Sequence, residues 1–278
     1  MKKILVTGSN GFIAKNLISK IKKLEYNCFT VNKEHGDLAK SDSWKTITPC
    51  DYVIHLAART FVPESWNSPD IYIRNNILTT TNALEYCKKN GSKMIFLSSY
   101  LYGNPKKYPI KEHFPLKATN PYALSKLLCE ELCTFYSSFL NTDHVILRPF
   151  NIYGPNQPDY FLISNIIKQI KNSDYISIDS LSPKRDYLYI DDLSNAIIKT
   201  IKYEGKESIF NIGFGKSYSV EEVINVIQNV FGSKLPIINK NIPRKNEILN
   251  TLADIKLAKK ELEWEPKYQF DEGIRNLL

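Results

Sequence analysis

The stretch that decides the fold is Ile4-Leu5-Val6-Thr7-Gly8-Ser9-Asn10-Gly11-Phe12-Ile13-Ala14. An apolar strand runs into a glycine turn, and a helical pattern follows at once. Gly8 permits a tight turn, Gly11 lets the backbone approach a diphosphate, and the small Ala14 permits close packing of the helix on the strand. The amino end of the helix supplies unpaired N–H groups and partial positive charge for phosphate oxygens. This arrangement predicts a dinucleotide-binding turn, whereas a glycine turn alone could be purely structural.

The same alternation of strand and helix continues through the first half of the chain. Apolar strand-like runs cover residues 4–7, 28–31, 52–57, 93–98 and 144–148, and helical stretches cover 11–24, 76–89 and 121–140. The runs are apolar throughout, which is typical of a parallel sheet covered by helices on both faces. We therefore predict a Rossmann-type, doubly wound parallel α/β sheet.

The pattern becomes irregular after Gly154-Pro155, with helical signals at 161–171, 221–231 and 255–262 and a strand signal at 187–190. We expect a dinucleotide-binding domain over residues 1–155 with a returning segment at about 185–212. Residues 156–184 and 213–278 are expected to form a smaller C-terminal substrate-binding lobe.

The composition excludes several classes of protein. The 278 residues are 43% hydrophobic and 24% charged, as in ordinary globular proteins. Only six of the 37 basic residues are Arg and the Lys are scattered, so the net charge of +8 favours a solvated surface over a nucleic-acid-binding face. No apolar run approaches the ~18 residues of a membrane span, and the N-terminal run is too short for a signal peptide. The five Cys form no CxxC pair and no spacing suggests a metal site, so we expect a cytoplasmic protein with reduced thiols.

The end of the second predicted strand bears on the choice of cofactor. An acidic residue there would accept the ribose hydroxyls of NAD and repel a 2′-phosphate, but the sequence reads Val31-Asn32-Lys33. Asn32 and Lys33 favour NADP(H), with NAD(H) possible because Lys33 could equally be an ordinary surface lysine. Asp37 and Leu38 are expected to cover the adenine.

A candidate catalytic pair opens the third predicted helix, in Tyr122-Ala123-Leu124-Ser125-Lys126 after Asn120-Pro121. Positions i and i+4 share one helix face, so we expect the ammonium to lower the pKa of the phenol toward the range useful for proton transfer. The YxxxK pattern is common by chance in amphipathic helices. The pattern becomes more significant because a buried strand upstream ends in a polar loop, which offers a hydroxyl for the same substrate oxygen. This segment reads Phe96-Leu97-Ser98-Ser99-Tyr100-Leu101-Tyr102-Gly103.

At this point the sequence resembles the extended short-chain dehydrogenase/reductase family, which comprises NAD(P)-dependent nucleotide-sugar epimerases, dehydratases and reductases. The resemblance extends over essentially the whole chain. It rests on nine segments in the family's order: TGSNGFIA, DYVIHLAA, NILTTTNALEYC, SSYLYG, NPYALSK, RPFNIYGP, RDYLYIDDL, FNIG and ADIKLAKKELEWEP.

The resemblance implies a role for each matching residue. Tyr122 would be the acid/base, Lys126 would hold the nicotinamide ribose and tune Tyr122, and Ser98, four before Tyr102, would bond the substrate oxygen. The implied cofactor-binding residues are Gly8, Ser9, Asn10, Gly11, Phe12, Ile13, Asn32, Lys33, Asp37, Leu38, Leu56, Ala57, Ala58, Asn76, Tyr122, Lys126, Pro149 and Phe150. The implied substrate-binding residues are Ser99, Asn151, Arg185 and Arg244, the two Arg for the diphosphate of a nucleotide sugar.

Departures from the family pattern narrow the expected reaction. The family's 4,6-dehydratases follow their catalytic hydroxyl with an acidic pair, but Ser99-Tyr100-Leu101 stand here. We therefore expect an NAD(P)H-dependent reductase of a nucleotide-linked 4-keto-(6-deoxy)hexose in glycan precursor synthesis. The alternatives are an NAD-dependent nucleotide-sugar 4-epimerase and a non-catalytic NAD(P)-binding regulator. A homodimer is expected because the family pairs the apolar outer faces of the two helices that contain Asn76 and Tyr122. His55 is interpreted as a structural residue at a strand end. Glu112 and His113 are interpreted as loop residues, with contact to the substrate as the alternative.

Overall fold

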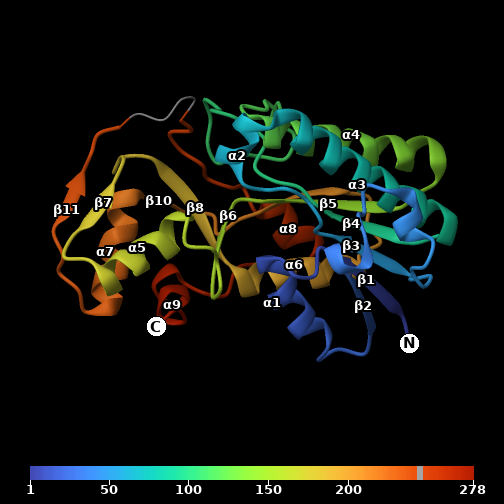
Figure 1. Ribbon diagram of the computed structural model, residues 1–278, viewed down its shortest axis with the longest axis horizontal. Helices are drawn as coiled ribbons and strands as arrows, with labels where there is room; N and C mark the ends of the chain where they lie inside the picture. Colours follow the sequence, from blue (N-terminus) through green and yellow to red (C-terminus); the bar gives the residue numbers. More distant parts are fainter. Residues whose placement is uncertain (243–246) are drawn as a thin grey trace.

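The computed structural model describes residues 1–242 and 247–278 (Figure 1). Its centre is a six-stranded sheet in the order β2-β1-β3-β4-β5-β9, with every neighbouring pair parallel. The strands are β1 (Lys3–Thr7), β2 (Asn27–Val31), β3 (Tyr52–His55), β4 (Lys93–Leu97), β5 (His144–Pro149) and β9 (Ile209–Ile212). The order reverses on either side of β1, so the doubly wound Rossmann-type sheet is confirmed.

Helices cover both faces of this sheet. On one face lie α1 (Phe12–Ile21) and α6 (Ile190–Ile201), and on the other lie α3 (Pro69–Asn90) and α4 (Pro121–Leu140) (Figure 1). Short helices occupy the connections: η1 (Lys33–His35), η2 (Ser41–Trp44) and α2 (Val62–Asn67). Because both faces are covered, the central strands are buried along most of their length, which explains their continuous apolar sequences.

A second part of the molecule stands beyond the carboxyl ends of the strands (Figure 1). Its three-stranded sheet, in the order β10-β8-β6, is formed by β6 (Asn151–Tyr153), β8 (Lys184–Tyr189) and β10 (Ser217–Ser219). A parallel pair joins β7 (Ile176–Ile178) to β11 (Ile237–Asn239). The helices α5 (Leu162–Asn172), α7 (Val220–Phe231) and α9 (Phe270–Arg275) pack around a core of their own.

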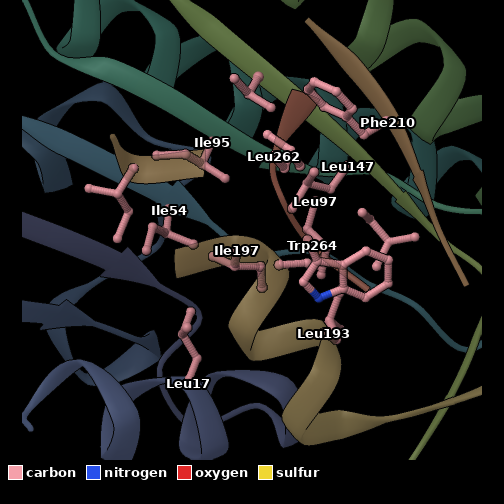
Figure 2. Packing of buried hydrophobic residues seen from close by; sticks show 14 of the residues in the cluster. Leu17, Ile54, Ile95, Leu97, Leu147, Leu193, Ile197, Phe210, Leu262 and Trp264 are labelled. Atoms are coloured by element: carbon pink, nitrogen blue, oxygen red, sulfur yellow. The ribbon is translucent and has the colours of Figure 1, made fainter. Parts of the chain in front are cut away.

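The two parts interleave more than the predicted boundaries suggest. Both β6 and β8 belong to the smaller sheet, although they were expected within the dinucleotide-binding segments. In the opposite direction, α8 (Lys256–Glu261) and Trp264 return to the core beneath the six-stranded sheet. Figure 2 shows Trp264 beside Leu193 of α6, with Leu147 of β5 nearby.

Local signals at the helix ends position the site. The Asn120 side chain accepts a hydrogen bond from the Ala123 N–H at 2.8 Å, and Pro121 occupies the first turn of α4. By contrast, α3 begins seven residues before the predicted start at 76, with Pro69 in its first turn. Of the described residues, no helix is both long and apolar enough to cross a lipid bilayer.

Candidate active site

The turn after β1 packs directly against the segment after β3. Gly8 has a φ of 70°, and a Cβ there would lie 2.9 Å from the backbone N and Cα of Ala57, so any side chain would push the two segments apart. The Ser9 N–H donates to the Val31 carbonyl at 3.2 Å, and Gly11 is the N-cap residue of α1. The result is a cradle of backbone and small residues at a helix amino end, which fits a dinucleotide diphosphate.

Thr7 and His55 support this cradle from below. The Thr7 hydroxyl oxygen accepts the N–H groups of Leu56 and Ala57, both at 3.1 Å. Its own proton is therefore directed to Nδ1 of His55 at 2.9 Å, which leaves the His55 proton on Nε2, 3.4 Å from the Thr80 hydroxyl. Burial, aided by a nearby lysine, lowers the pKa of His55 to about 3. The imidazole is thus neutral and ties β1, β3 and α3 together.

The predicted ribose end of the cradle contains an acidic residue that sequence reasoning overlooked. Asn32 caps η1 by accepting the Glu34 N–H at 2.9 Å, and its amide donates to Asn10 Oδ1 at 3.0 Å. The Glu34 carboxylate lies 3.4 Å from the same amide. Lys33 is exposed, and the Asp37 carboxylate accepts the N–H of Ala39. The predicted ribose end of the cradle is therefore flanked by one basic side chain, Lys33, and one acidic side chain, Glu34.

Asn76 joins the cradle to the catalytic helix. It is 1% exposed, and its side chain accepts the Arg59 N–H at 2.8 Å and donates to the Arg59 carbonyl at 3.1 Å. The same amide donates to the Ser125 hydroxyl of α4 at 2.9 Å. The other predicted cofactor residues lie in the turn and first helical turn (Ser9, Asn10, Phe12, Ile13), in η1 and its flanks (Asp37, Leu38), after β3 (Leu56, Ala57, Ala58), and at the end of β5 (Pro149, Phe150).

Tyr122 and Lys126 lie on adjacent turns of α4, but their electrostatics differ from the expectation. Burial raises the pKa of Tyr122, and a hydrogen bond with Ser99 opposes that rise. The ammonium of Lys126 lies 4.0 Å from the centroid of the Phe96 ring, and burial lowers the pKa of Lys126. The expected lowering of the phenol pKa by Lys126 is therefore not found, because desolvation of the phenolate dominates.

The two loop hydroxyls, Ser98 and Ser99, lie in different surroundings. β4 ends at Leu97, so Ser98 is the first residue beyond it, and Ser98 is 4% exposed. The Ser98 hydroxyl donates to the carboxylate of Glu130 and is turned toward the interior. The next residue, Ser99, is half-buried and acts to lower the pKa of Tyr122. The Ser98 hydroxyl therefore forms an internal hydrogen bond, and the role of each serine toward substrate stays a prediction.

The predicted substrate residues lie on the smaller sheet or next to it. Asn151 begins β6, and its amide lies 3.5 Å from the Asp186 carbonyl. Arg185 of β8 forms an ion pair with Glu247. Arg244 lies outside the described residues. An arginine expected to meet a diphosphate is therefore held by a carboxylate of this chain.

Sequence reasoning missed a buried polar cluster behind the catalytic loop. It consists of Glu130, Arg148, Tyr102 and Asn211, each no more than 3% exposed, together with the partly buried Glu112. Charged residues within segments predicted to be buried, in α4 and β5, were the available signal. The Glu112 carboxylate accepts the Asn211 N–H at 3.0 Å, in keeping with the structural interpretation of Glu112. Over residues 1–242 and 247–278, no group of three or more His, Cys, Asp or Glu could hold a metal ion.

Comparison with known proteins identifies the family. Residues 4–213 match the NAD dependent epimerase/dehydratase family. The chain is 32% identical to a putative UDP-glucose 4-epimerase of Methanocaldococcus jannaschii, over 99% of this chain and 97% of the relative. It is 27% identical to the GDP-6-deoxy-D-mannose reductase of Pseudomonas aeruginosa, over 100% of this chain and 96% of the relative.

The solved structures agree with the sequence comparisons. The structure of RMD from Pseudomonas aeruginosa complexed with NADPH superimposes with a TM-score of 0.92 at 26% identity. The superposition covers 99% of this chain and 97% of that one. The chain belongs to the NAD dependent epimerase/dehydratase family of extended short-chain dehydrogenases/reductases.

Proposed function

We propose that the protein is an NAD(P)H-dependent reductase of a nucleotide-linked 4-keto-6-deoxyhexose, which serves glycan precursor synthesis. The observation that carries this proposal is the placement of Tyr122 and Lys126 on adjacent turns of α4, together with a serine loop in which Ser99-Tyr100-Leu101 stand where the family's dehydratases have an acidic pair. A phenol whose pKa is raised by burial retains its proton at neutral pH. Reduction of a ketone requires a proton donor, whereas oxidation of an alcohol, the first step of a 4-epimerase, requires a base.

The residues of this chain divide the work in the proposed reaction. Ser98 hydrogen-bonds the keto oxygen, Ser99 contacts the sugar, and Tyr122 transfers its proton to the keto oxygen as it becomes a hydroxyl. Lys126 binds the ribose of the cofactor, and Asn76 keeps α4 against the cradle. When bound, the nicotinamide supplies the hydride. The protein contributes orientation and proton delivery.

The substrate diphosphate is assigned to Arg185, with Asn151 and Arg244 as further contacts. Arg185 is 19% exposed and paired with Glu247. The diphosphate would replace that carboxylate, because a guanidinium fork also bonds phosphate oxygens.

We favour NADP(H) as the cofactor. Lys33 is exposed beside Asn32, where a 2′-phosphate would lie, and the similar RMD structure contains NADPH. The Glu34 carboxylate lies 3.4 Å from the Asn32 amide, and its negative charge would repel the 2′-phosphate. This repulsion weakens the preference for NADP(H) over NAD(H), so NAD(H) remains a usable cofactor.

A homodimer is also proposed. Two neighbouring helices, α3 and α4, expose apolar side chains on their outer surface, a feature typical of subunit interfaces. These side chains are Ile71, Leu78, Leu124, Leu128, Phe135 and Phe139. Light scattering at micromolar concentration should give twice the chain mass, and a monomeric mass would contradict the proposal.

The decisive experiment mixes purified protein with NADPH and a panel of nucleotide-linked 4-keto-6-deoxy sugars and follows loss of NADPH absorbance. Oxidation of NADPH that depends on one of these sugars is the expected result. If every sugar remains unreduced, the reductase proposal fails.

A 4-epimerase is the second candidate, because a putative UDP-glucose 4-epimerase aligns over nearly the whole chain. An epimerase regenerates its cofactor in each cycle, so denatured protein should release stoichiometric NAD(H). A reductase exchanges its cofactor with solution and should release little. A non-catalytic NAD(P)-binding regulator would keep its function after Tyr122→Phe.

A further inference from the structure

We propose that the Phe96 ring positions Lys126 by holding its ammonium in a cation–π contact, which leaves the other side of the ammonium free for the cofactor ribose. Phe96 contacts neither substrate nor cofactor in this assignment, so it acts through Lys126 alone. The inference rests on the cofactor-binding role proposed for Lys126. The contact itself is tested without cofactor or substrate, so the two ideas can fail separately.

The contact between the ammonium and the ring lies inside the molecule. Lys126 Nζ is 4.0 Å from the centroid of the Phe96 ring, well within the range of a cation–π interaction. Phe96 is 0% exposed and Lys126 is 3% exposed. The face of an aromatic ring has a negative potential, and it attracts a cation more strongly where water is excluded. The ring therefore stabilises a positive charge that has lost most of its hydration.

Within the part of the chain that the structure describes, no acceptor forms a hydrogen bond or ion pair with the Lys126 ammonium. The carboxylate one turn further along α4, that of Glu130, is bonded by Arg148 at 2.6 Å, so its charge is compensated. Burial raises the pKa of the thiols of Cys129 and Cys133, which keeps both neutral. Burial also lowers the pKa of Lys126, against the weaker influence of these groups. The ring is therefore the contact that opposes the loss of the ammonium proton most directly.

Two neighbouring strands fix the place of the ring. Phe96 of β4 is the register partner of His55 of β3, and the two rings stack with their centroids 6.1 Å apart and 18° between their planes. His55 is 1% exposed and bonded to Thr7, so neither ring can turn away freely. The imidazole is neutral because burial lowers the pKa of His55 to about 3. No positive charge on His55 therefore repels the ammonium from behind the Phe96 ring.

The aromatic character of residue 96, rather than its size, is what this arrangement uses. Along β4, Ile95 and Leu97 pack into the core on one face of the sheet, whereas Phe96 packs on the face that α4 covers. An aliphatic side chain could fill the same space, but it would present no negative ring face to the ammonium. The position of Lys126 would then depend on a flexible four-carbon stem. The ring therefore restricts where the ammonium lies.

The first test keeps the shape of the ring and changes its charge distribution. Phe96 of the full chain is replaced by phenylalanine carrying one, two or three fluorine atoms, each of which withdraws electrons from the ring face and weakens a cation–π contact. Lysine labelled with carbon-13 at Cε reports ammonium ionisation by NMR, and Lys126→Met identifies the Lys126 signal. The titration midpoint of that signal should fall with each fluorine, by about one pH unit over the series.

The matched control places the same fluorinated residues at Phe210 of β9. Phe210 is also 0% exposed, but it packs on the other face of the sheet, where its ring meets the edge of Tyr203 at 5.4 Å. This series measures the effect of fluorine in the buried core and should leave the Lys126 midpoint unchanged. A Lys126 midpoint that stays constant through the Phe96 series, or that falls equally in both series, overturns the cation–π contact.

The second test asks whether the contact serves the cofactor. Phe96→Leu removes the ring, and the affinity for NADPH in a fluorescence titration should fall about tenfold, whereas Phe210→Leu should retain it. If Phe96→Leu does not fold, the trifluorinated Phe96 protein takes its place in this titration. Wild-type NADPH affinity in these Phe96 variants overturns the positioning role. A wild type that binds NADPH but reduces no sugar would overturn only the proposed reaction.

Discussion

The buried carboxylate of Asp186 should make the stability of the protein depend on pH. It is 0% exposed and accepts three backbone N–H groups, from Phe214 at 2.6 Å, Gly215 at 2.9 Å and Ala253 at 3.0 Å. Burial raises the pKa of Asp186 from 3.8 to about 7, although those three donors oppose the rise. This side chain therefore joins β8 to the segments that contain Phe214 and Ala253. Because the carboxyl group is buried, its ionisation costs free energy in the folded state.

The sign and size of the effect follow from proton linkage. Between pH 3.8 and about 7 the folded state binds a proton that the unfolded state has released, so the free energy of unfolding falls as the pH rises. At about 1.4 kcal/mol per pH unit, the shift corresponds to a loss on the order of 4 kcal/mol across that interval. Asp186→Asn cannot ionise and should lack this component.

Denaturant unfolding of wild type and Asp186→Asn at a series of pH values between 4 and 8 measures the component directly. The difference in unfolding free energy, wild type minus variant, should fall by about 1 kcal/mol per pH unit in this range. All other titrating groups cancel in that difference. A difference that stays flat from pH 4.5 to 7 would refute the reasoning, because it would mean that the three N–H donors outweigh burial and keep the carboxylate ionised throughout.

Three further substitutions test the cradle, the cofactor preference and the dimer. Gly8→Ala should abolish tight NADPH binding, because its Cβ would meet the Ala57 backbone at 2.9 Å at a positive φ; fluorescence titration with wild-type affinity would contradict this. Glu34→Gln should raise the kcat/KM ratio for NADPH over NADH by about tenfold, since one repulsive charge near the 2′-phosphate is removed; an unchanged ratio would place Glu34 away from the ribose. Phe139→Glu, at a position 72% exposed, should halve the mass measured by light scattering without lowering Tm, and a retained dimer would exclude this end of α4 from the interface.

The strength of local signals explains which parts of the site could be predicted from the sequence. Tyr122 and Lys126 were placed correctly on one helix because Asn120-Pro121 marks the start of α4 unambiguously. The glycine turn was equally recognisable, since strand, turn and helix follow one another without interruption. In both cases the relevant geometry lies within a dozen residues of chain.

The internal partner of Ser98 could not be predicted from any local pattern. Ser98 bonds Glu130 because α4 and β5 bring the Glu130–Arg148 pair behind the end of β4. The pKa of Tyr122 was misjudged for a related reason. Spacing places Lys126 on the correct face of α4, but only tertiary packing sets its ammonium over the Phe96 ring.

The late return of the chain to its first sheet limits how the protein can be divided. β9 begins at residue 209 and completes the sheet beside β5, and Trp264 closes the core by donating its indole N–H to the Asp192 carbonyl at 2.9 Å. A fragment that stops at residue 155 would contain every predicted cofactor residue, yet it would present β5 as an unpaired edge and leave an apolar face uncovered. Such a fragment should aggregate rather than bind a dinucleotide, so chimeras within this family need to exchange the discontinuous segments together.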